Sequence, residues 1–169
     1  MANTPMTLTH HEPLPDHEVA LTLKDRVAGG REIWLLGRFV IGALFLMSGV
    51  EKLMGLNAFA ASLVKGGLSN TAAHVLAPLA ALAETLGGFC IMVGLATSWA
   101  SLVMFAFTII AALIAHRFWE IPGGEERITQ MNHFIKNMMI AAAFCLLYVA
   151  GGGPCSIDRW RREAKLSGS

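Results

Sequence analysis

The sequence predicts an all-α integral membrane protein, with four transmembrane helices in an antiparallel bundle and both termini in the cytoplasm. Of its 169 residues, 54% are apolar and only 15% are charged, which is typical of a membrane protein. Runs of about 20 mostly apolar residues are long enough to cross a bilayer as helices. Such runs are Ile33 to Met54, Ala72 to Ala96, Ser98 to Trp119 and Asn132 to Ala150. Lys and Arg concentrate in the two terminal segments, and the positive-inside rule places such segments in the cytoplasm.

These spans divide the chain into three parts. Residues 1–32 form a polar N-terminal tail that we expect to be mobile, because it shows no sustained helical or strand period before about Lys24. It contains no apolar run suited to a cleaved signal peptide, so we expect the first span to act as the targeting signal. Residues 33–150 form the transmembrane domain, and residues 151–169 form a basic cytoplasmic tail. With no separate soluble domain, any chemistry takes place in the bundle.

The first span carries small and polar residues at helical spacing. Arg38, Phe45 and Lys52 recur every seven residues, so with Ser48 they lie on one stripe of the helix. Small residues also let the backbone of a neighbouring helix approach closely. In this span they are Gly37, Gly42 and Gly49.

The connections between spans are short. The loop from Gly55 to Thr71 has an apolar pair at i and i+4 before the glycines 66 and 67, which predicts a short interfacial helix that ends at glycine. Only Thr97 and its neighbours separate the second span from the third, so these two helices are antiparallel neighbours. Three glycines and Pro154 end the fourth span.

The second span contains one carboxylate near the middle of the membrane, Glu84. Its helical face carries small side chains, namely Ala77, Ala80, Ala81, Gly87 and Gly88. A carboxyl at this depth is costly unless it is paired, protonated or hydrated, and such residues face the bundle interior or a cavity. We expect Glu84 to be a functional or paired residue, with Lys52, Lys136 or His116 as its partner.

The other polar residues of the spans gather in one half of the bilayer. The loops after the first and third spans lie on the same side of the membrane, which brings together Glu51, Lys52, His74, His116, Arg117, His133, Lys136 and Asn137. The opposite half contains essentially Arg38 alone. Ionisable groups within a membrane indicate a functional site. The alternative is that the long cationic side chains extend to the lipid headgroups and that the histidines are ordinary interfacial residues.

Several classes of function are disfavoured. A net charge of +1 without clustered Lys and Arg argues against binding to nucleic acid. The three cysteines form no CxxC pair, so a dithiol enzyme is not expected. The histidines form no CxxCH or HExxH motif, so no metal or haem site is predicted.

Four motifs occur in order along the spans: the segment from Arg38 to Lys52, Glu84-Thr-Leu-Gly-Gly88, His116 at the end of the third span, and Gly153-Pro-Cys-Ser-Ile-Asp-Arg159. Together they resemble the DoxX family. The stretches from His116 to Trp119 and from Asn132 to Asn137 look most similar to its bacterial inner-membrane branch, of the YphA type. The resemblance implies a four-helix protein of the cell inner membrane, related to proteins that are subunits or partners of sulfur and quinone oxidoreductases. It also implies that Arg38, Lys52, Glu84 and His116, with Lys136 and Asn137 in this branch, occupy the family's recurrent polar positions.

These observations favour a quinone-linked redox membrane protein or oxidoreductase subunit. Glu84 and His116 are the expected catalytic residues, because quinone reduction takes up protons together with electrons. The expected substrate-binding residues are Arg38, Lys52, Lys136 and Asn137. A redox partner protein would supply the electrons, since no flavin, nicotinamide or iron-sulfur motif is present. The alternative is a non-enzymatic module for binding or transport of a small molecule, or a membrane scaffold for redox partners; glycine-lined faces also allow a homo-oligomer.

Overall fold

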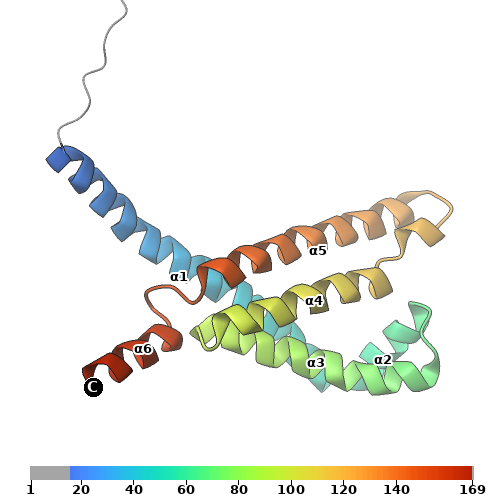
Figure 1. Cartoon of the computed structure of the whole chain (residues 1–169). Helices are drawn as coiled ribbons and strands as arrows, with labels where there is room; N and C mark the ends of the chain where they lie inside the picture. The colour runs from blue at the N-terminus through green and yellow to red at the C-terminus, as the bar shows by residue number, and fades with distance from the viewer. Residues whose placement is uncertain (1–15, 169) are drawn as a thin grey trace, which may run out of the picture.

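The computed structural model describes residues 16–168, with the backbone alone for residues 16–29. Its elements are α1 (Asp16–Met54), α2 (Leu56–Lys65), α3 (Asn70–Val93), α4 (Thr97–Ala115), the 3-10 helix η1 (Phe118–Glu120), α5 (Glu125–Ala150) and α6 (Ile157–Ser167) (Figure 1). Within the described residues, four helical segments are long and apolar enough to cross a membrane. They are Gly30–Met54, Asn70–Val93, Thr97–Glu120 and Glu125–Ala150. The predicted all-α, four-span fold is confirmed.

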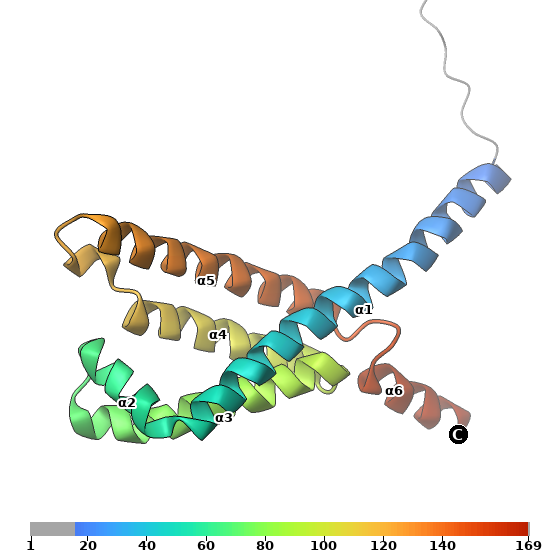
Figure 2. The same cartoon turned by 180° about the vertical axis from the view of Figure 1, so that it is seen from behind.

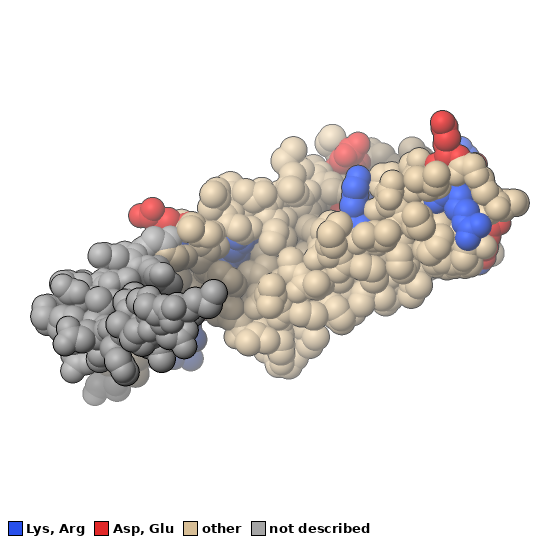
Figure 3. Space-filling view, turned by 90° about the horizontal axis from the view of Figure 1, so that it is seen from above, with Lys and Arg blue, Asp and Glu red and all other residues tan. Residues whose placement is uncertain are grey.

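The helices pack as two pairs, α1 with α3 and α4 with α5, and the turn between α3 and α4 joins the pairs. The N-terminal part of α1 and the short α6 lie at one end of the molecule, which we call the terminal end (Figures 1 and 2). At the other, the loop end, lie α2 and the connection from α4 to α5. On the face shown in Figure 3, the surface between the two ends is largely free of charged side chains, as a lipid-facing belt requires.

Several boundaries differ from the sequence predictions. Residues 16–32 of the expected polar tail belong to α1, which begins at Asp16, while residues 1–15 lie outside the described residues. Helix α5 begins at Glu125 rather than Asn132, with two acidic residues in its first turn, where they interact favourably with the helix dipole. Conversely, α4 ends at Ala115. The length of each apolar run therefore predicted where the spans lie. It did not predict the polar turns by which α1 and α5 extend beyond these runs.

The two shorter helices of the connections also form. The expected interfacial helix is α2, which ends at Gly66 as predicted. The basic C-terminal tail contains α6, which the sequence reasoning did not predict. Its N-cap is Ser156, whose hydroxyl accepts a hydrogen bond of 3.2 Å from the Arg159 backbone N–H.

Glycines bring α1 and α3 into close contact. A Cβ added to Gly88 would lie only 2.5 Å from the Leu46 backbone nitrogen, and one added to Gly42 would overlap the backbone of α3 at Met92. About two turns after Gly42, Gly49 lies against Thr85 in the same way. Gly37, in contrast, has no neighbour within 4 Å of such a Cβ. Two of the three predicted glycines of the first span therefore allow the close approach.

The apolar core lies toward the terminal end. Its buried members come from α3, α4 and α5, and they are Ile91, Met104, Phe144 and Leu147. Phe45 of α1 packs on Phe144 with ring centroids 5.2 Å apart. These contacts fill the terminal half of the bundle with large apolar side chains. They do not extend into the loop half.

The contact between α1 and α3 predicts a difference between two glycine variants. Gly88→Ala should lower the free energy of unfolding by about 2 kcal/mol, because the added methyl group overlaps backbone atoms that cannot move independently. Gly37→Ala is the matched control, since its methyl group points into open space and alanine is the better helix former. Unfolding of both variants in detergent would measure this difference, and equal stability would contradict the contact.

Candidate functional site

A cavity of about 600 Å³ occupies the loop half of the bundle, between α1, α2, α3 and α4. Leucine, isoleucine, phenylalanine and alanine side chains make up most of its wall. Polar side chains interrupt this wall at six positions, which are Ser48, Lys52, Glu84, Thr108, His116 and Asn137. Four of the six site residues predicted from the sequence therefore border one cavity.

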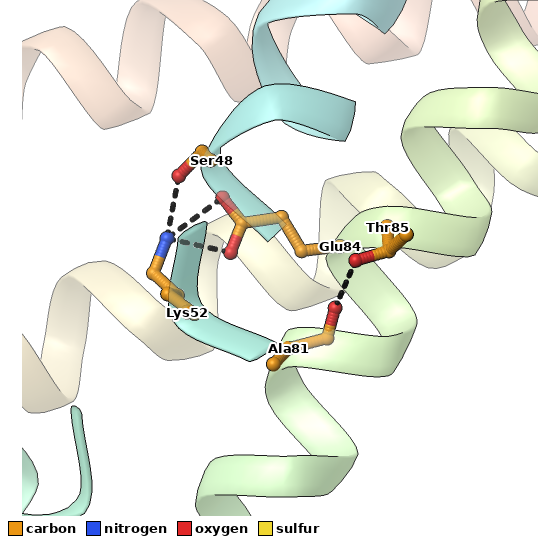
Figure 4. Close-up of polar contacts among 5 residues, drawn as sticks. All are labelled: Ser48, Lys52, Ala81, Glu84 and Thr85. Carbon is orange, nitrogen blue, oxygen red and sulfur yellow. Dashed lines mark hydrogen bonds and ion pairs between the residues drawn. The ribbon is translucent and has the colours of Figure 1, made fainter. Parts of the chain in front are cut away.

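The central polar contact of the cavity is an ion pair between α1 and α3 (Figure 4). The Lys52 ammonium donates to both Glu84 carboxylate oxygens, at 2.9 and 2.7 Å, and to the Ser48 hydroxyl at 2.6 Å. The Glu84 side chain is only 6% exposed, whereas that of Lys52 is 29% exposed. Of the three partners expected for Glu84, the structure selects Lys52.

Helix α2 covers the loop end of this ion pair. The Lys52 ammonium lies 5.6 Å from the centre of the Phe59 ring, close enough for a cation–π interaction. Phe59 and Leu63 also line the cavity, so α2 forms part of its wall. The i, i+4 apolar pair that predicted an interfacial helix therefore faces the cavity.

His116 lies at the edge of the cavity, where α4 ends. Its Nδ1 atom is 2.9 Å from the Gln130 side-chain oxygen, and its ring stacks on His133 with centroids 5.1 Å apart. The Asn137 side chain donates a hydrogen bond of 3.0 Å to the His133 backbone carbonyl. The first half of α5 thus fixes the position of the imidazole.

A second cavity, of about 270 Å³, adjoins the first at the loop end. The two share Ile114 and Ala115, and Gln130 lines the second while its partner His116 lines the first. Charged side chains dominate the second cavity; they are Lys65, Arg117, Glu120 and Glu126. It is therefore a polar vestibule beside the apolar cavity.

The structure places two predicted site residues outside the main cavity. Lys136 is exposed and is not part of the cavity wall. Arg38 is buried near the terminal end, where its guanidinium donates to the backbone carbonyls of Ile91, at 3.1 Å, and Cys155. Arg38 therefore joins the end of α3 to the segment before α6.

Asp158 completes this terminal contact by capping α4. Its carboxylate accepts hydrogen bonds from the backbone N–H groups of Ala96, at 2.7 Å, and Thr97, at 2.8 Å, and from the Thr97 hydroxyl at 2.9 Å. Ala96 has a left-handed backbone with a φ of 46°, which is unfavourable for a residue other than glycine. Burial alone would raise the pKa of Asp158, but these hydrogen bonds outweigh it and hold the pKa below its usual value.

The sequence did not predict that Gln130 would be the partner of His116 or that Asp158 would cap α4. Nothing in the sequence distinguishes Gln130 from the other polar residues of the connection. Asp158 lies within the family-like Gly-Pro-Cys-Ser-Ile-Asp motif, which could have marked it as a residue with a specific role. Its partner Thr97 could not be identified in this way, because it lies 61 residues earlier in the sequence. Within the described residues, no group of three or more His, Cys, Asp or Glu side chains is arranged as metal ligands would be.

Comparison with known proteins gives a family match over half of the chain. The DoxX family model matches residues 33–117. Inner membrane protein YphA of Escherichia coli (strain K12) is 28% identical over 125 residues, which cover 74% of this chain and 87% of that protein. Inner membrane protein YqjF of the same organism is 29% identical over 125 residues, covering 74% and 88%. No solved structure matches the chain significantly.

Because Lys52 and Glu84 form an ion pair, the effects of their substitution on the free energy of unfolding should be strongly coupled. Lys52→Met should destabilise the protein by about 3 kcal/mol, because it leaves the buried Glu84 carboxylate without its partner, and Glu84→Leu should cost less, because the Lys52 ammonium that it leaves is only partly buried. The double variant should cost clearly less than the sum of the two. Unfolding measurements on the four proteins give the coupling, with the exposed Glu51→Gln as a control. Additive single effects would show that the two charges do not interact.

The contact between Asp158 and the first residues of α4 should weaken in acid. Because the pKa of Asp158 in the folded protein lies below its unfolded value of about 3.9, the carboxylate stabilises the fold above that pH. This stability is lost as the pH falls through the folded pKa. Asp158→Asn should reproduce the loss at neutral pH and weaken the contact by about 2 kcal/mol.

Hydrogen exchange at the Ala96 and Thr97 amides would measure this effect. The control is Glu163→Gln, which removes only an exposed ion pair with Arg159 on α6. Unchanged exchange in Asp158→Asn would contradict the cap.

Proposed function

Because the chain belongs to the DoxX family, we propose that it is a quinone-linked redox subunit of the inner membrane, with a membrane quinone bound in the main cavity. The names of the two relatives support the location, since both are inner membrane proteins. The positive-inside rule then puts the termini in the cytoplasm and the cavity in the outer half of the membrane. Membership of the family supports a membrane protein in general. The geometry of the cavity supports the proposal that its ligand is a quinone.

The cavity itself carries this proposal. Its volume of about 600 Å³ lies within the usual range for small-molecule sites, and its apolar wall suits an aromatic ring with a hydrocarbon tail. Four large apolar side chains that line it are also exposed, namely Leu44, Leu76, Leu79 and Ile110. In a membrane, exposed apolar side chains meet lipid, so a ligand dissolved in the bilayer can enter between the helices.

The polar residues of the cavity suit proton exchange with a quinone. Conversion of a quinone to a hydroquinone takes two electrons and two protons, and the reverse reaction releases them. Glu84 and His116 are the groups that exchange protons with the ligand oxygens, while Lys52 holds the carboxylate in place. The electrons pass to or from a partner protein that carries a flavin, haem or iron-sulfur cofactor. Arg38 and Lys136 lie outside the cavity and take no part in this step.

The first test is whether the purified protein binds a quinone. We expect its organic extract to contain quinone above the amount carried over with lipid, and a short-chain quinone to bind in nanodiscs. His116→Ala should weaken binding of the corresponding hydroquinone about tenfold through loss of a hydrogen-bonding group. Lys136→Gln is the matched control, because it removes a nearby charge outside the cavity and should bind as the unaltered protein does. No binding above the lipid background would contradict the proposal.

A second measurement separates a redox subunit from a binding module. Glu84→Gln should slow electrochemical reduction of the bound quinone about a hundredfold if Glu84 exchanges protons with it. Normal binding together with an unchanged rate would contradict the redox role and favour the non-enzymatic alternative.

A further inference from the structure

The hydrogen bond of His116 determines which of its nitrogens carries the proton. The group 2.9 Å from Nδ1 is the Gln130 side-chain oxygen, which only accepts hydrogen bonds. Nδ1 therefore carries the hydrogen. Because a neutral imidazole has one donor and one acceptor, Nε2 is left as an acceptor.

Because Nδ1 already has a partner in the protein, Nε2 is the ring nitrogen left for a ligand. Gln130 occupies the Nδ1 edge from the side of the second cavity, and His133 covers one face of the ring. His116 still forms part of the wall of the main cavity. The imidazole thus offers the ligand a hydrogen-bond acceptor.

The strongest donors of the cavity are already engaged by the protein. An ammonium group has three protons, and that of Lys52 donates to Ser48 and to both oxygens of Glu84. The Thr108 hydroxyl donates to the Met104 carbonyl at 2.7 Å. A ligand carbonyl can still accept a hydrogen bond from the Ser48 hydroxyl or from the second N–H of Asn137, but only a ligand with a hydroxyl group can donate to His116.

We propose that the cavity selects the hydroxyl-bearing form of its ligand, a hydroquinone or a lipophilic phenol, whose hydroxyl donates to His116 Nε2. Gln130 is the positioning residue, because it holds His116 in the tautomer that leaves Nε2 unprotonated. The choice of ring class rests on the proposed function. The preference for a hydroxyl rests on the hydrogen bond between His116 and Gln130, which leaves an acceptor that only a donor on the ligand can use.

Nitrogen NMR of the full-length protein, labelled with ¹⁵N-histidine, tests the tautomer without any ligand. The signal of His116, assigned from its loss in His116→Ala, should show the Nδ1–H tautomer at mildly alkaline pH. Gln130→Leu removes the acceptor and should shift His116 toward the Nε2–H tautomer. Gln130→Glu keeps an acceptor and should restore Nδ1–H, and Glu126→Gln, in the same second cavity, should change nothing. An Nε2–H tautomer in the unaltered protein would overturn the role of Gln130.

Binding of three related compounds in nanodiscs tests the ligand preference. A short-chain hydroquinone should bind about tenfold more tightly than its dimethyl ether and than its quinone, since neither of these has a hydroxyl to donate. The advantage should disappear in Gln130→Leu and return in Gln130→Glu. Equal affinity for the three compounds would overturn the inference and leave quinone binding intact. Binding of none of them would overturn the proposed function as well.

Discussion

A carboxylate in the middle of a membrane span is stable only with a partner, and in this protein the partner of Glu84 comes from another helix. The Lys52 ammonium donates two hydrogen bonds to the carboxylate and a third to the Ser48 hydroxyl. Removing two charges from water costs several kcal/mol per ion, so the pair needs this geometry to compensate. The geometry in turn requires α1 and α3 to lie very close together. The contact of glycines 42, 49 and 88 satisfies that requirement.

Close packing of one helix pair leaves space elsewhere in the bundle. Helix α1 lies tightly against α3, while α4 lies mainly against α5. At the terminal end the gap between the pairs is filled by large side chains, with Phe45 reaching Phe144. At the loop end the small side chains that surround Glu84 leave the gap open, and α2 only partly covers it. Ala80 and Ala83, which lie close to Glu84 on α3, line this gap and help to create the cavity beside the ion pair.

The sequence allowed the spans, the inward stripe of α1 and the buried position of Glu84 to be predicted, because helical periodicity and the membrane each impose a strong local constraint. Helical periodicity shows which residues share one face of a helix. It does not show how deep each of them lies in the membrane or which residue of another helix it contacts. Arg38 and Lys52 share a stripe, yet Arg38 contacts the C-terminal segment and only Lys52 contacts the cavity. The contact between His116 and Gln130 depends on the path of the connection from α4 to α5, and no local pattern encodes that path.

The two buried polar clusters differ in the kind of partner that they use, and this difference locates the function. Arg38 and Asp158 are bound mainly to backbone groups, which a ligand cannot replace without unfolding the ends of α3 and α4. Lys52, Glu84 and His116 are bound to side chains, and all three also border open space. Side-chain partners can rotate and can exchange a protein contact for a ligand contact at modest cost. The terminal cluster therefore holds the chain together, and the loop half is where we propose that a membrane-soluble ligand binds and exchanges protons.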